Sequence, residues 1–173
     1  PVTKPLKQLL DAILTDSRWD MKYLGMQIMV EGIALAAFGL IHQSANEPLI
    51  REITERIMQD ESRHVAFGVL SLKDVYKDMP ESELRDREEF IVESSILMRD
   101  RFLGQDVWDR LGLPQKECQE AADQSEMMQL FRTLLFSKIV PNVKRLGLLT
   151  PRVRQGFADL GVLHFESLAE KEI

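Results

Sequence analysis

Cysteine and histidine are scarce in this sequence, and the signals typical of β-strands are nearly absent. The 173 residues contain a single cysteine, Cys118, and three histidines. One cysteine excludes an internal disulfide framework and fits a reducing compartment, so we expect a cytoplasmic protein. Glycine and proline are sparse, and no run of β-branched residues alternates with polar ones. These absences argue against a β-sheet protein.

Clusters of basic residues are also missing. A net charge of -6 and a pI near 5.2 leave no basic face to neutralise phosphates, which argues against a nucleic-acid binder. The apolar run at residues 24–41 has Glu31 near its middle and is shorter than the about 20 residues that span a bilayer. We therefore expect no membrane span. The hydrophobic share of 45% is enough for one buried core.

Apolar residues recur at three- and four-residue spacing along most of the chain, which predicts an all-α fold. Three long helices are predicted, at about residues 16–42, 48–78 and 82–110. Asn46 is the expected cap of the helix that starts at Pro48. Antiparallel helices of this length, joined by short loops, are typical of a helical bundle.

The predicted bundle helices occupy residues 16–112, and residues 113–173 are predicted to be a helical extension. Within the extension, Pro141 is expected to end or kink a helix. We expect residues 1–173 to form one all-α domain or the C-terminal part of a longer one. The sequence begins at Pro1 without an initiator methionine, which favours the second expectation.

Glu31 is an unusual residue in its context. It lies in "LGMQIMVEGIALAAFGLI", where Gln27 is the only other polar side chain. A lone carboxylate on an apolar helix face is costly, so it must be protonated, paired or bound to a cation. An ion pair with an arginine or lysine of another helix is the simplest alternative to a metal.

The next helix carries Glu61 and His64, three residues apart. Both lie in an apolar stripe that runs from Ile50 through Ile57 to Leu72, so both are expected to point inward. Glu-x-x-His alone is a weak signal, because so short a spacing recurs by chance. His64 on its own is equally well explained as a core histidine bonded to a carboxylate.

The positions of the three residues strengthen the signal. Glu31 and Glu61 lie at similar distances from the turn "QSANEP", so an antiparallel pair of helices brings them and His64 to the same depth. Carboxylate oxygen and imidazole nitrogen together suit iron or manganese. Asp60, about 100° around the helix from Glu61, could accept a hydrogen bond from a metal-bound imidazole.

These two segments resemble a known family. "MVEGIALAAF", followed about thirty residues later by "QDESRHVAFG", is similar to the second half of ferritin-like di-iron carboxylate proteins. The resemblance covers about residues 20–75 and includes the ribonucleotide-reductase-small-subunit-like, acyl-desaturase-like and N-oxygenase-like branches. In that family each half supplies one acidic helix and one Glu-x-x-His helix.

The resemblance implies a ferritin-like bundle and assigns roles by position. It implies Glu31, Glu61 and His64 as metal ligands and Asp60 as the acid behind them. The implied cofactor is two iron ions, with a manganese–iron pair as the alternative. The implied reaction uses dioxygen to oxidise a small organic substrate. An electron donor and a homodimer are the partners that we expect with it.

The second half of such a site has no counterpart in this sequence, because neither His42 nor His164 follows a glutamate by three. We expect an N-terminal segment of a longer chain to supply it, with a symmetry-related copy as the alternative. Two other functions stay open. One is iron handling, as in ferritin or rubrerythrin, and the other is a metal-free helical interaction module.

Overall fold

The computed structural model describes residues 2–168, and every regular element in that range is a helix. The all-α prediction is confirmed. The longest helix runs Trp19–Ser44 and has three parts, α2 (Trp19–Tyr23), the π-helical segment η1 (Leu24–Val30) and α3 (Glu31–Ser44). The remaining elements are α1 (Lys4–Thr15), α4 (Pro48–Leu72), α5 (Glu81–Asp100), η2 (Arg101–Leu103), α6 (Gln105–Arg110), α7 (Gln115–Gln124), α8 (Glu126–Arg145), α9 (Pro151–Asp159) and η3 (Leu163–Ser167).

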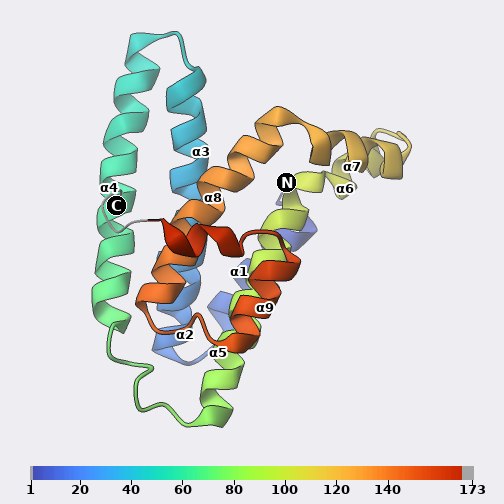
Figure 1. The fold of residues 1–173 in the computed structure, drawn as a ribbon. Coiled ribbons are helices and arrows are strands. Elements are labelled where there is room, and N and C mark those ends of the chain that lie inside the picture. Colours follow the sequence, from blue (N-terminus) through green and yellow to red (C-terminus); the bar gives the residue numbers. More distant parts are fainter. Residues whose placement is uncertain (1, 169–173) are drawn as a thin grey trace.

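Helices α3 and α4 form an antiparallel hairpin that stands along one side of the molecule (Figure 1). Its turn lies at one end, beyond the other helices. Glu47 caps α4, because its carboxylate accepts a hydrogen bond from the Ile50 N–H at 3.0 Å. The predicted cap, Asn46, is therefore wrong by one residue. Pro48 occupies the first turn as expected, where its missing N–H costs nothing.

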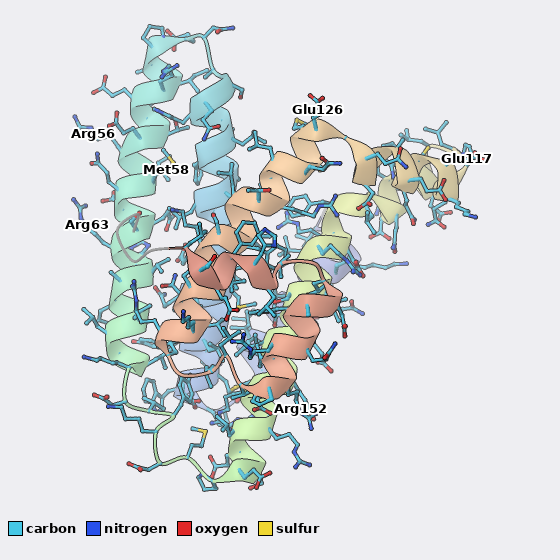
Figure 2. All side chains as sticks on the ribbon, viewed as in Figure 1. Arg56, Met58, Arg63, Glu117, Glu126 and Arg152 are labelled. Atoms are coloured by element: carbon cyan, nitrogen blue, oxygen red, sulfur yellow. The ribbon has the colours of Figure 1, made fainter. Side chains whose placement is uncertain are left out.

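The seam between α3 and α4 is closely packed along its length. Near the turn, the Nδ1–H of His42 donates to the Arg51 carbonyl at 3.0 Å, and Nδ1 lies 3.4 Å from the Thr54 hydroxyl. Further along, a Cβ added to Gly39 would lie 3.7 Å from the Met58 sulfur. Figure 2 shows Met58 between the two helices. This register sets which residues of α3 and α4 meet further down.

Helix α8 crosses α3 and covers one of its sides (Figure 1). Gly32 permits the close approach, because a Cβ there would lie 3.0 Å from Ile139. Leu135 and Phe136 of α8 are fully buried. The predicted extension thus builds part of the core, although residues 169–173 of it lie outside the described residues. Pro141 does not end this helix, which continues to Arg145.

Helix α5 ends much earlier than the predicted helix at 82–110. Its last residue is Asp100, and Gly104 then adopts a left-handed conformation with φ of 67°. The indole Nε1–H of Trp108 donates to the Leu103 carbonyl at 2.6 Å and closes this bend. The prediction of one continuous helix is wrong, because a left-handed residue cannot continue a right-handed helix.

Replacing Gly104 with alanine is expected to lower the free energy of unfolding by about 1–2 kcal/mol. A Cβ there would also lie 2.9 Å from Nε1 of Trp108, which adds a steric clash. Gly112 is a matched control, since its φ is 64° but nothing lies within 4 Å of the added Cβ. Urea unfolding should show a larger loss for Gly104→Ala than for Gly112→Ala. Equal losses would contradict the role given to Trp108.

A buried ion pair joins the long helix to α5. The Nε–H of Arg87 donates to Oδ2 of Asp20 at 2.9 Å, and its Nη2 donates to Oδ1 at 3.0 Å. Both residues are buried, with Arg87 only 2% exposed. The sequence does not reveal this pair, because Arg87 sits in the charged stretch "ESELRDREEF" and resembles a solvated residue.

One helix among the described residues, Trp19–Ser44, is long and apolar enough to cross a membrane by length and composition. The core helix of a soluble protein meets the same two criteria. In this structure the helix packs against α4 and α8. The expectation of no membrane span stays a prediction.

Candidate metal centre

Glu31, Glu61 and His64 meet in the α3–α4 seam. One donor atom from each lies within 4.8 Å of the others. His64 Nδ1 is 2.9 Å from Glu61 Oε2 and 3.7 Å from Glu31 Oε1. The expected convergence of these three side chains is therefore observed, and Nδ1 is the imidazole atom that faces both carboxylates.

The two carboxylates and the imidazole differ in exposure. The Glu31 and Glu61 side chains are 16% and 18% exposed, whereas that of His64 is 57% exposed. The expectation that His64 points into the core is wrong. On the same helix face, Ile50 and Ile53 are also exposed, at 44% and 48%. The predicted apolar stripe is therefore exposed at Ile50, Ile53 and His64 and buried at Val65, Gly68 and Leu72.

The local electrostatics hold a proton at the site. Burial, together with the hydrogen bond and negative charge of Glu61, raises the pKa of Glu31 to about 7. The hydrogen bond to Glu61 also raises the pKa of His64. Within the described residues Glu31 has no arginine or lysine as an ion-pair partner, which removes the simplest alternative there. A cation in this position could replace the shared protons.

The raised pKa of Glu31 predicts a pH dependence of stability in the metal-free protein. Folded Glu31 holds its proton up to about pH 7, whereas an unfolded carboxyl releases it near 4.5. Unfolding therefore releases a proton between these values, and the free energy of unfolding falls as pH rises from 4.5 to 7. Glu31→Gln should be free of this loss below pH 6.5, above which His64, whose pKa is also raised, contributes a loss of its own. The measurement is urea unfolding of both proteins in chelator across that range, and parallel pH curves would contradict the assignment.

A π-helical segment directly precedes Glu31. The N–H of Glu31 bonds to the carbonyl of Met26, five residues back, and the π-helical hydrogen bonding spans Leu24–Val30. Such segments are rare and occur frequently at functional sites. The wider turn inserts one residue and so changes the register of the helix just before Glu31. The sequence does not reveal this segment, because its apolar residues fit an α-helix equally well.

Asp60 lies on the exposed side of α4, and its negative charge contributes to raising the pKa of His64. Its carboxylate pairs with Nη1 of Arg63 rather than with an imidazole. Figure 2 shows Arg63 projecting from α4 on the side opposite α3. That Asp60 accepts a hydrogen bond from a metal-bound imidazole stays a prediction.

The donor set is two carboxylates and one imidazole, which suits a divalent first-row transition metal. Comparison with known proteins adds no family to this geometry: no protein-family model, no curated protein and no solved structure matches the chain. The ferritin-like resemblance therefore rests on the two quoted segments and on the residues that they bring together.

Proposed function

We propose that this chain is the metal-binding half of a dinuclear iron carboxylate oxidase that uses dioxygen to oxidise a small organic substrate. The observation that carries the proposal is the meeting of Glu31, Glu61 and His64, whose donor atoms lie within 4.8 Å of one another. The branch of the family and the identity of the reaction rest on the resemblance of residues 20–75.

The residues present fit part of such a centre. Two carboxylates compensate the charge of a cation, and burial makes that charge compensation stronger than in water. His64 offers a neutral nitrogen, Nδ1, beside both carboxylates. Bound iron would supply the electrons that reduce dioxygen, with an external donor restoring them. Three donors are half of what two ions need, so we propose that a further segment of the natural chain supplies the rest, with a second copy as the alternative.

Each residue has a distinct task in this proposal. Glu31 loses its proton when a cation binds, because the cation replaces the proton as the partner of the carboxylate. Glu61 Oε2 lies 2.9 Å from Nδ1 of His64, so a cation that replaces the proton between them would find both ligand atoms already together. The buried core residues Ile28 and Val65, near the site in sequence, exclude water from this side of the seam.

Anaerobic loading with Fe(II), followed by desalting and metal analysis, tests the proposal. We expect at least about one iron per chain to remain, because three protein donors hold the ion. On exposure to oxygen, a stable ferric centre supports the oxidase, whereas release of free ferric iron supports iron handling. Retention of no iron would defeat both metal functions.

A metal-free polar network is the remaining alternative, and one observation favours it. Glu61 and His64 already satisfy each other through a hydrogen bond of 2.9 Å without a cation. In that case Glu31 would stay protonated near neutral pH, consistent with its raised pKa of about 7. The same iron analysis separates this alternative from the other two.

A further inference from the structure

Gln27 lies in the π-helical segment, one turn before Glu31, and packs against α4. A Cβ added to Gly68 would lie 2.4 Å from Cβ of Gln27 and 3.3 Å from its Cγ. Gly68 is one turn after His64, the residue opposite Glu31. Gln27 and Gly68 therefore face each other between the long helix and α4, one helical turn away from Glu31 and His64. The absence of a side chain on Gly68 lets the amide of Gln27 occupy this space.

The amide oxygen of Gln27 is buried and has no hydrogen-bond partner among the described residues. Buried polar atoms are nearly always bonded, and an unmatched acceptor costs stability. Gln27 is also the only polar residue besides Glu31 in the apolar run at residues 24–41. Its oxygen can only accept a hydrogen bond, so what it lacks is a donor.

We propose that Gln27 is a positioning residue of the metal centre, whose amide oxygen accepts a hydrogen bond from water in the hydration shell of the bound cation. The inference rests on the proposed function. Glu31, Glu61 and His64 give a cation three donor side chains, so water must fill some of its remaining positions. Long helical side chains lean over the preceding turn, which for Glu31 is the turn that carries Gln27. Water bonded to a cation is a strong hydrogen-bond donor. The unpaired Gln27 oxygen, one turn from Glu31, is an acceptor for it.

The test compares Gln27→Met with the wild type in two measurements. Titration with Mn²⁺, followed by the EPR signal of the free ion, gives the affinity. Thermal unfolding in chelator gives the stability of the metal-free protein. We expect Gln27→Met to bind Mn²⁺ about 10- to 100-fold more weakly, as is typical for partners of metal ligands. Its metal-free melting temperature should stay equal or rise, because the unpaired oxygen is gone.

Two further variants complete the design. Gln27→Glu keeps an acceptor oxygen at the same length and should keep most of the affinity. Gln43→Met makes the same substitution at an exposed position of the same long helix and should change nothing. Equal Mn²⁺ affinity of Gln27→Met and the wild type would overturn this inference alone. Absence of Mn²⁺ binding by the wild type would overturn the proposed function and this inference together.

Discussion

Replacing Glu61 with glutamine is expected to weaken binding of Fe²⁺ or Mn²⁺ by at least about 100-fold. Loss of a residue that only supports a ligand typically costs 10- to 100-fold, and Glu61 is itself a proposed ligand. Its carboxylate also lies 2.9 Å from Nδ1 of His64, and that contact brings the two ligand atoms together. The substitution should in addition lower the pKa of Glu31 from about 7, because Glu61 contributes to raising it. Calorimetric titration gives the affinity, and NMR titration of the Glu31 carboxyl gives the pKa.

Glu55→Gln is the matched control for this prediction. Glu55 lies on the same helix, α4, and is exposed. Its substitution removes the same charge without touching the seam, so metal affinity should change less than about 2-fold, since exposed charges are largely screened. An equal loss in both variants would mean that net charge, rather than the three residues, attracts the cation.

Replacing Arg87 with methionine is expected to lower the free energy of unfolding by about 3–5 kcal/mol, because the Asp20 carboxylate would stay buried without its partner. Two hydrogen bonds of 2.9 and 3.0 Å join the pair in the structure. Thermal or urea unfolding measures the loss. Since the pair links the long helix to α5, metal affinity measured at a temperature where the variant is folded should change little.

The control for this second prediction is Arg85→Met on the same helix. Arg85 is exposed and pairs with Glu81 at 3.7 Å, a contact on the surface. Its loss should cost less than about 1 kcal/mol. The double variant Asp20→Leu with Arg87→Met should recover part of the stability, because no unpaired charge remains. A loss below about 1 kcal/mol for Arg87→Met alone would show that water reaches the pair.

The meeting of Glu31, Glu61 and His64 could be predicted because two simple rules determine it. Helical periodicity places residues on faces, and a short turn fixes an antiparallel register. The turn between α3 and α4 is indeed short, with Pro48 in the first turn of α4. These rules needed no knowledge of the rest of the chain.

Other features depended on contacts that no local pattern encodes. Arg87 can be buried because Asp20, 67 residues away, accepts two of its hydrogen bonds, and the Glu83 carbonyl accepts a third. The exposure of His64, at 57%, depends on how the other elements pack against α4, and helical periodicity alone does not encode that packing. The π-helical turn before Glu31 differs from an α-helix by one hydrogen-bond step, which apolar side chains do not distinguish.

Anomalous diffraction from crystals grown anaerobically with Fe(II) tests whether Glu31, Glu61 and His64 together bind a metal ion. The prediction is an anomalous peak at the iron edge between the two carboxylates and Nδ1 of His64, and its disappearance in the Glu31→Gln, Glu61→Gln double variant. A loaded crystal with no peak among these three residues, or with a peak that the double variant retains, would contradict the account.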